Sequence, residues 1–332
     1  MAGNTKQMLA GAAVAALLTM PAVGASSAED HTWITHSPQN FTAHAVDLER
    51  VLADVTVNPT GGNGQISMTV AGPKYLVEDV QSHSNGTTLV ISGPQKAANN
   101  FSVWDVSKWF DYSDVGEKSR VKIVLNVPRG TDITTHKMIG GLKAGDLDSK
   151  VSIETVSGDV AIGRVKEAKL SVVGSGDISV GAVAGKLTLE VAGSGDVKAG
   201  PSQTAHVSIA GSGATTLGAV NGGLDADIAG SGDLVVASVN GPVDVSIAGA
   251  GRTDIKAGHA TPLKASLVGS GDFNFGGDAV DPNISAIGSG DVWIKSYTGK
   301  LSSSGMADIT IGDKKVKVGK HHGDDDDDDD DN

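Results

Sequence analysis

A four-residue motif, Gly-Ser-Gly-Asp, recurs along this chain at a nearly constant interval, and no other feature restricts the possible folds so strongly. The first glycine of the motif or of its variants stands at Gly174, Gly193, Gly211, Gly230, Gly249, Gly269 and Gly288. The successive steps are 19, 18, 19, 19, 20 and 19 residues. A fixed period of this length is typical of a solenoid, a propeller or an array of small repeated units.

Apolar residues alternate with polar ones on both sides of each glycine. Four and two positions before it stand Leu170/Val172, Leu189/Val191, Val207/Ile209, Ala226/Ile228, Val245/Ile247, Ala265/Leu267 and Ile284/Ala286. Four and six positions after it stand, among others, Ile178/Val180, Val197/Ala199, Leu234/Val236, Phe273/Phe275 and Val292/Ile294. This alternation predicts a strand before each corner and another after it. A propeller blade needs roughly 40 residues, about twice the length of each repeat, which argues against a propeller.

We therefore predict an all-β protein, a parallel β-solenoid whose coils of about 19 residues stack about 4.8 Å apart around an apolar interior. The 45 glycines and the 4% of aromatic residues suit short strands joined by tight turns. The solenoid is expected over residues 137–318, with VSGDVAI (156–162) as a degenerate first coil and GMADITI (305–311) as the last. Residues 29–136 alternate without the period, which predicts hairpin strands that cap the solenoid.

Both ends of the chain differ from this body. Residues 1–28 contain Lys6, an apolar run from Met8 to Met20 and then small residues, which predicts a secretory signal peptide cleaved after Ala25 or Ala28. The apolar run is too short for a membrane span, and no second one follows, so we expect an exported protein without an integral membrane segment after cleavage. Residues 319–332 include eight consecutive aspartates and predict a disordered acidic tail.

Cysteine content and charge exclude several classes of function. The chain has no cysteine, so disulfides, thiolate nucleophiles and lipid-carrying cysteines are absent. The formal net charge is −13, and 25 basic and 31 acidic residues remain when Lys6 and the eight tail aspartates are set aside. Such a surface does not attract phosphate backbones, so we expect no nucleic-acid partner.

The repeated (V/I)xGSGD(V/I)xV coils follow a β segment that ends in IVLNVPRGTDI. Together they resemble the bacterial family called "putative auto-transporter adhesin, head GIN domain" over residues 40–315. The resemblance implies a right-handed parallel β-helix on the bacterial envelope with an adhesive role. The chain departs from the pattern in two ways: it contains no Gly-Ile-Asn tripeptide, and no membrane-barrel segment follows the repeats. The family offers no catalytic residues to transfer.

The corner aspartates would form a column if the coils stack in register. They are Asp159, Asp177, Asp196, Asp233, Asp272 and Asp291. Carboxylates and turn carbonyls are calcium ligands, so a calcium ladder is one hypothesis. Nothing recurs, however, at the nine-residue period of the calcium-binding β-roll, and Ala214 and Arg252 interrupt the column. We therefore predict structural corners without a metal or cofactor, with the calcium column as the alternative.

Five of the chain's aromatic residues lie between positions 101 and 112. Aromatic faces stack on sugar rings, so Trp104, Trp109, Phe110 and Tyr112 are the candidate ligand contacts. The alternative is that these rings are buried against the solenoid, as a hairpin tip or a short helix.

Catalysis is the least favoured class of function. The outward positions carry Ser, Thr, Lys and scattered Asp without a dense cluster of acids and bases, and no GxSxG, HxH or HExxH motif occurs. The nine histidines are scattered singly, apart from His321 and His322. We expect a non-catalytic envelope protein, located in the periplasm or on the cell surface, that binds a glycan, a matrix or an envelope partner. A structural periplasmic spacer is the main alternative, and a carbohydrate-active β-helix enzyme is the other; the sequence does not define an oligomeric state.

Overall fold

The computed structural model describes residues 32–61, 64–94, 120–306 and 308–316. They divide into two compact units, one ending at Gly200 (unit 1) and one beginning at Pro201 (unit 2). The fold is nearly all β, with about nine turns of a β-solenoid and coils of about 19 residues, so the predicted fold class is confirmed. Within the described ranges, no helix is long and apolar enough to cross a membrane.

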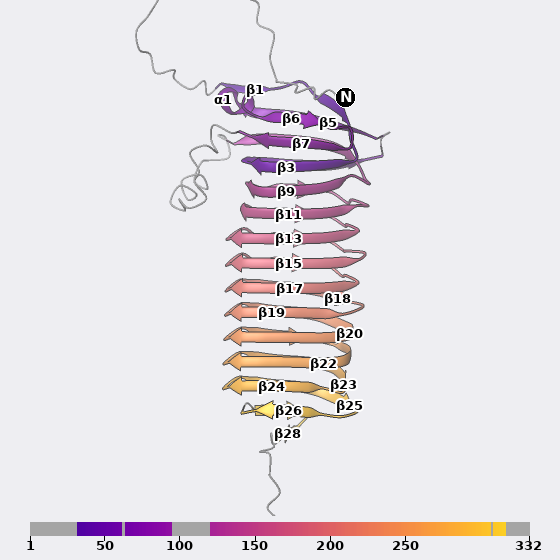
Figure 1. The fold of residues 1–332 in the computed structure, drawn as a ribbon, viewed down its shortest axis with the longest axis vertical. Coiled ribbons are helices and arrows are strands. Elements are labelled where there is room, and N and C mark those ends of the chain that lie inside the picture. Colours follow the sequence, from indigo (N-terminus) through magenta and orange to yellow (C-terminus); the bar gives the residue numbers. More distant parts are fainter. Residues whose placement is uncertain (1–31, 62–63, 95–119, 307, 317–332) are drawn as a thin grey trace, which may run out of the picture. The chain divides into compact units, whose positions relative to one another are not determined.

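The repeated coils of unit 1 each contribute one long and one short strand, and the long strands lie one below another in Figure 1. The long strands are β9 (Asp132–Ile139), β11 (Lys150–Ser157), β13 (Glu167–Gly174) and β15 (Lys186–Gly193). The short strands are β10 (Leu142–Ala144), β12 (Val160–Ile162), β14 (Ile178–Val180) and β16 (Val197–Ala199). Each strand pairs in parallel with its equivalent in the next coil, so two parallel sheets enclose the interior.

The N-terminal strands of unit 1 continue this stack in an order that differs from the chain order. They are β3 (Ala45–Val51), β4 (Ala53–Thr60), β7 (Thr88–Gly93) and β8 (Val121–Pro128). Strand β3 pairs in parallel with both β7 and β9, and β4 pairs in parallel with both β8 and β10. The coil formed by β3 and β4 therefore lies between the later strands β7/β8 and β9/β10.

Antiparallel strands complete this end of unit 1. They are β1 (Trp33–Thr35), β2 (Gln39–Thr42), β5 (Gln65–Pro73) and β6 (Gln81–Ser84), next to the short helix α1 (Lys74–Val77). Strand β5 pairs with β1, β2 and β8, and β6 pairs with β7. Antiparallel pairing occurs here, whereas β3 and β4, which we expected to be hairpin strands, pair in parallel. Alternation with a period of two is the same for both kinds of partner, so it does not distinguish them.

Unit 2 repeats the coil with longer strands. One sheet contains β17 (Thr204–Gly211), β19 (Leu224–Gly230), β22 (Gly258–Gly269), β24 (Asn283–Gly288) and β26 (Ser302–Gly305). The other contains β18 (Ala214–Val220), β21 (Arg252–Ile255), β23 (Asp272–Val280), β25 (Asp291–Thr298) and β27 (Asp308–Ile311). The 17-residue β20 (Asp233–Gly249) takes part in both. Strand β28 (Lys314–Val316) closes the unit by pairing antiparallel with β27.

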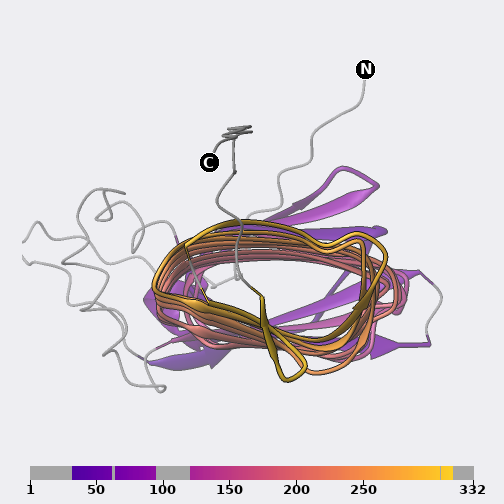
Figure 2. The ribbon, with the colours of Figure 1, turned by 90° about the horizontal axis from the view of Figure 1, so that it is seen from below.

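Seen end on, these coils trace a flattened loop around their interior (Figure 2).

The predicted inward residues form the core. Every residue expected to face inward at four and two positions before the corner glycine is buried, as are the quoted residues four and six positions after it. The largest of them, Phe273 and Phe275, are fully buried. The assignment of apolar faces from the alternation is confirmed.

The corner glycines are required by the stacking itself. Gly193 and Gly249 have φ values of +142° and +135°, a region that L side chains rarely adopt. A Cβ atom on Gly193 would overlap the carbonyl oxygen of Gly174, and one on Gly249 would overlap that of Gly230. The backbone of one coil therefore occupies the space that a side chain would need on the next.

Replacing Gly249 by Ala should lower the free energy of unfolding by about 3 kcal/mol, because the added methyl meets backbone that cannot move away and the positive φ is strained. Denaturant unfolding followed by circular dichroism measures this. Ala250→Ser, which restores the residue found in most corners, is the matched control and should change stability by less than about 0.5 kcal/mol. Equal stability of the two variants would contradict the stacking argument.

Two buried threonines of unit 2 interrupt an apolar column. Thr215, Leu234, Thr253 and Phe273 follow one another in register. The Oγ1 atoms of Thr215 and Thr253 are buried and have no hydrogen-bond partner among the described residues. In unit 1 the buried Thr135 differs, because its Oγ1 accepts a bond from the Glu154 amide (3.0 Å) and donates one to the Glu154 carbonyl (3.2 Å).

Replacing Thr253 by Val should raise the free energy of unfolding by about 1 kcal/mol, because a methyl takes the place of an unpaired hydroxyl of the same size. The same change at Thr135 should lower it by about 1–3 kcal/mol, because the amide of Glu154 loses its acceptor. Parallel denaturant curves test both. A loss of stability in both variants would show that the Thr253 hydroxyl is satisfied.

Candidate functional site

The corner aspartates join each coil to the next one. In unit 1, Oδ1 of Asp159 accepts the backbone N–H of Asp177 (3.2 Å), and Oδ1 of Asp177 accepts that of Asp196 (3.0 Å). The repeated carboxylate therefore bonds the amide at the equivalent position one coil later. This geometry explains why Asp is the last residue of the motif.

Unit 2 uses the same device and adds a cation. Oδ1 of Asp233 accepts the N–H of Arg252 (3.1 Å), and Oδ1 of Asp272 accepts the N–H of Asp291 (3.2 Å). The guanidinium Nη2 of Arg252 lies 3.0 Å from Oδ2 of Asp272. Arg252 thus separates the carboxylates of Asp233 and Asp272 and neutralises part of the column.

The hypothesis of a calcium column can be compared with the arrangement of the described side chains. In those ranges, no group of three or more His, Cys, Asp or Glu side chains is arranged to hold a metal ion. The calcium column of Asp177, Asp196, Asp233, Asp272 and Asp291 stays a hypothesis that ion-binding measurements would have to test.

Several predicted features lie outside the described residues. The candidate contacts Trp104, Trp109, Phe110 and Tyr112 belong to residues 95–119. The predicted signal peptide and the acidic tail with His321 and His322 also fall in ranges that the structure does not describe.

The outward face of the long strands in unit 1 carries charges of alternating sign. Lys150 Nζ lies 2.9 Å from Oε2 of Glu167 in the next coil, and Lys169 Nζ lies 3.5 Å from Oε1 of Glu190. The hydrogen bond to Glu167 raises the pKa of Lys150 above its ordinary value. These pairs are well exposed, so each contributes little to stability, but together they neutralise the face.

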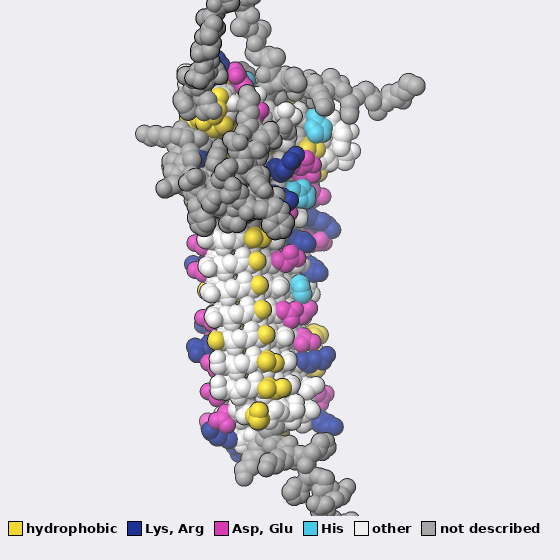
Figure 3. All heavy atoms as spheres, turned by 60° about the vertical axis from the view of Figure 1, so that its left-hand side comes forward, with side chains coloured by type: hydrophobic (Ala, Val, Ile, Leu, Met, Phe, Trp, Pro, Cys, Tyr) yellow, Lys and Arg dark blue, Asp and Glu magenta, His cyan; other side chains and the backbone are white. Residues whose placement is uncertain are grey.

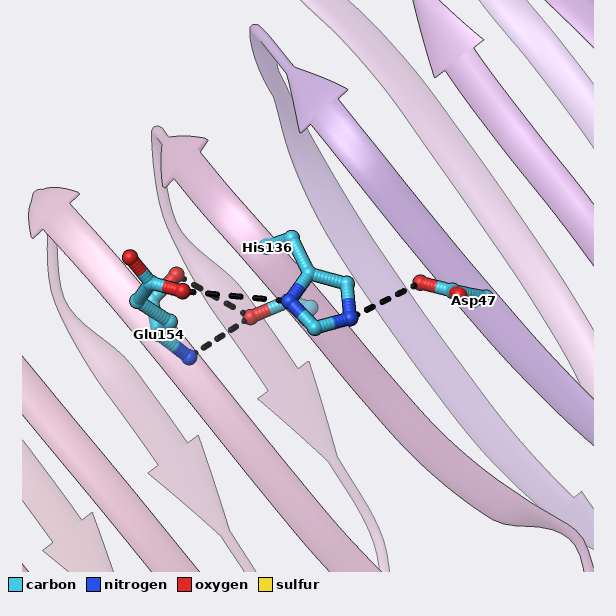
Figure 4. Close-up of polar contacts among 4 residues, drawn as sticks. Asp47, His136 and Glu154 are labelled. Atoms are coloured by element: carbon cyan, nitrogen blue, oxygen red, sulfur yellow. Dashed lines mark hydrogen bonds and ion pairs between the residues drawn. The ribbon is translucent and has the colours of Figure 1, made fainter.

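A cluster of three titratable side chains lies at the N-terminal end of this face (Figure 4). His136 on β9 stands between Asp47 on β3 and Glu154 on β11. Its Nε2 is 3.7 Å from Oδ1 of Asp47, and its Nδ1 is 3.8 Å from Oε2 of Glu154. The imidazole therefore lies within ion-pair distance of one carboxylate on each side.

Local backbone irregularities accompany this cluster. Arg50 and Lys137 have φ values of 50° and 53°, and the register of β3 with β7 and of β9 with β11 shifts beside them. Bulges of this kind redirect side chains. Sequence analysis missed the cluster, because residues 47, 136 and 154 share no motif and become neighbours only when β3 stacks on β9.

Asp47 is the most unusual member of the cluster. Its side chain is 25% exposed, and its buried Oδ1 has no hydrogen-bond partner among the described residues. Burial raises its pKa above the ordinary 3.8, while His136 lowers it and Glu49 raises it further. The folded state therefore binds a proton at Asp47 more readily than the unfolded state does.

In both units the outward position directly before the corner glycine is uncharged, and in unit 2 it forms the longest apolar series. Alanine, valine and isoleucine stand directly before the glycine, at Ala210, Ala229, Ala248, Val268 and Ile287. Figure 3 shows hydrophobic side chains following one another along the coils beside an uncharged strip, with charged side chains on both flanks. Two residues before these apolar positions, Ser208, Asp227, Ser246 and Ser266 stand in register. The charges are concentrated four residues before them, at Asp225, Asp244 and Lys264, and His206 Nδ1 lies 3.0 Å from Oδ2 of Asp225.

Replacing Asp47 by Asn should stabilise the protein at neutral pH, because an ionised and partly buried carboxylate is removed. Because the pKa of Asp47 is raised by folding, its contribution to stability is complete below the pKa of the unfolded state and is lost as the pH rises through the pKa of the folded state. Between these two pKa values, the melting temperature of the wild type should therefore fall relative to that of the variant. Glu49→Gln removes the neighbouring negative charge and should move the interval to lower pH. Identical pH profiles for wild type and Asp47→Asn would contradict this assignment.

Several solved structures are similar to this chain, and three of them are described here. A putative adhesin from Parabacteroides distasonis ATCC 8503 is 14% identical, with 84% of this chain and 98% of that chain covered and a TM-score of 0.42. A putative adhesin from Bacteroides fragilis NCTC 9343 is 15% identical, with 84% and 99% covered and a TM-score of 0.32. A putative lipid binding protein from Parabacteroides distasonis ATCC 8503 is 16% identical, with 83% and 95% covered and a TM-score of 0.36.

No curated protein matches the chain. The family described as "Putative auto-transporter adhesin, head GIN domain" matches residues 50–242, which include part of the N-terminal segment and the GSGD repeats as far as Asp233. This match spans more than half of the 332 residues. The chain therefore belongs to the family of putative auto-transporter adhesins with a head GIN domain.

Proposed function

We propose that the protein is a non-catalytic, exported protein of the bacterial cell envelope that binds a surface, either a glycan or a matrix or envelope partner. The family description supports an adhesive role. The observation that carries the proposal is the register of the coils: equivalent positions pair directly from strand to strand in both units. Side chains of one kind therefore recur about every 4.8 Å along a straight column.

Such columns suit a partner that is itself repetitive. Many weak contacts at a regular spacing add up to firm attachment when they act together, without a deep pocket. The described residues on these faces are mainly Ser, Thr, Asp, Lys and Ala, which can hydrogen-bond hydroxyl-rich surfaces but make few strong individual contacts. Trp104, Trp109, Phe110 and Tyr112 are proposed to add stacking contacts to sugar rings.

A structural periplasmic spacer is the second candidate. The alternating ion pairs of unit 1, such as Lys150 with Glu167, favour it because they satisfy the charges of that face internally. An enzyme is less favoured: glycosidases use paired carboxylates about 5–10 Å apart around the bond that is cleaved. The carboxylates of Asp47 and Glu154 instead lie on an outward sheet face, and Glu154 is 42% exposed, so they do not surround a bond to be cleaved.

A glycan-array screen of the purified protein tests the proposed function. We expect binding to one class of glycan, and Trp109→Ala should weaken it about tenfold because a stacking face is lost. Trp109→Phe, which keeps an aromatic face, should retain most of the binding. Trp33→Ala is the matched control, since Trp33 is a 44% exposed tryptophan that is not among the proposed contacts. Absence of binding by the wild type to glycans and to isolated envelopes would favour the spacer.

A further inference from the structure

An exposed apolar column runs along the outward face of unit 2. Ala210, Ala229, Ala248, Val268 and Ile287 follow one another in unbroken parallel register on β17, β19, β20, β22 and β24. Val268 is 55% exposed and Ile287 is 53% exposed. Large β-branched side chains in contact with water on adjacent strands are costly to maintain unless another surface covers them.

The side chains of this column increase in size from one end to the other. The column is therefore complementary to a second copy of itself in the opposite order. It begins with three alanines and continues with valine and isoleucine. If a second copy faces it with the order of the coils reversed, Ala210 meets Ile287, Ala229 meets Val268, and Ala248 meets itself. A small side chain then faces a large one at every level, which keeps the spacing between the two sheets nearly constant.

The charged column four residues earlier follows the same symmetry. The column between them contains one charge, Asp227, which reversal places opposite Ser266. Four residues before the apolar column stand His206, Asp225, Asp244, Lys264 and Asn283 in register. Reversal places Asp225 opposite Lys264 and His206 opposite Asn283. It also places Asp244 opposite its own copy, with Lys264 Nζ of the same chain 3.8 Å away from Oδ2 of Asp244.

The other face-to-face arrangement is disfavoured. A two-fold axis along the stacking direction would keep the order of the coils, so Ile287 would meet Ile287 while Ala210 met Ala210. The uneven spacing between the two sheets opposes this arrangement.

We propose that unit 2 is a dimerisation surface whose partner is a second copy of the same chain, facing it with reversed coil order around a two-fold axis through Ala248. The arrangement is isologous, as in most homodimers. Five strands about 4.8 Å apart and about eight residues long would bury roughly 600 Å² per copy, or about 1,200 Å² in total. This area lies at the lower end for stable complexes, so the dimer is weak and depends on concentration.

Sedimentation velocity of the purified protein between about 5 and 500 µM tests the proposal, because a weak interface should become populated within this range. We expect the weight-average sedimentation coefficient of the wild type to rise with concentration. Ile287→Lys should abolish the rise by placing a charge against Ala210 of the second copy. Val173→Lys is the matched control: Val173 occupies the equivalent repeat position in unit 1 and is 48% exposed. Melting curves verify that both variants are folded.

A charge exchange tests the reversed order. Asp225→Lys and Lys264→Asp should each raise the Kd of dimerisation about tenfold, and the combined variant should return it to within about threefold of the wild type. Asp244→Asn should lower the Kd, because it removes the like charges that meet at the axis. A wild type that stays monomeric, an equal effect of Val173→Lys and Ile287→Lys, or an additive loss in the double charge variant would each overturn the proposal.

Discussion

The parallel stacking of one coil directly on the next is the constraint on which everything else in this protein depends. The amide–carbonyl bonds between coils fix the spacing and leave no room for a side chain at the corners. Gly193 and Gly249 illustrate this, since a Cβ atom on either would overlap a carbonyl oxygen of the preceding coil. The aspartate of the motif completes the corner by accepting the next coil's amide. The motif is therefore a requirement of backbone packing.

The same stacking turns spacing in the sequence into adjacency in space. Two residues 19 positions apart become neighbours, so the side chains of each outward column must be compatible with one another. Columns that would accumulate one charge are interrupted, as by Arg252 between Asp233 and Asp272, or alternate in sign, as Lys150 with Glu167. The exposed column that ends in Val268 and Ile287 is different, because it concentrates apolar surface.

These two kinds of column differ in how their outward side chains are satisfied. The charged face of unit 1 satisfies its ion pairs within the chain, with His136 joining Asp47 and Glu154 at one end. The face of unit 2 keeps an apolar column flanked by Asp225 and Lys264, which is suited to association with a similar surface. A paired adhesin would present two copies of any ligand-binding column, and avidity would then offset weak individual contacts.

The sequence by itself determined the coil, its length and which residues face inward, because period and alternation follow directly from strand geometry. Leu170, Val172 and Phe273 are buried as that pattern predicts. Only the tertiary structure showed that β3 and β4 pair in parallel between later strands, because alternation is identical for parallel and antiparallel partners. The cluster of Asp47, His136 and Glu154 was likewise invisible in the sequence. Its members become neighbours because the strands stack in an order that differs from their order in the chain. The spacing of residues along the sequence does not predict that order.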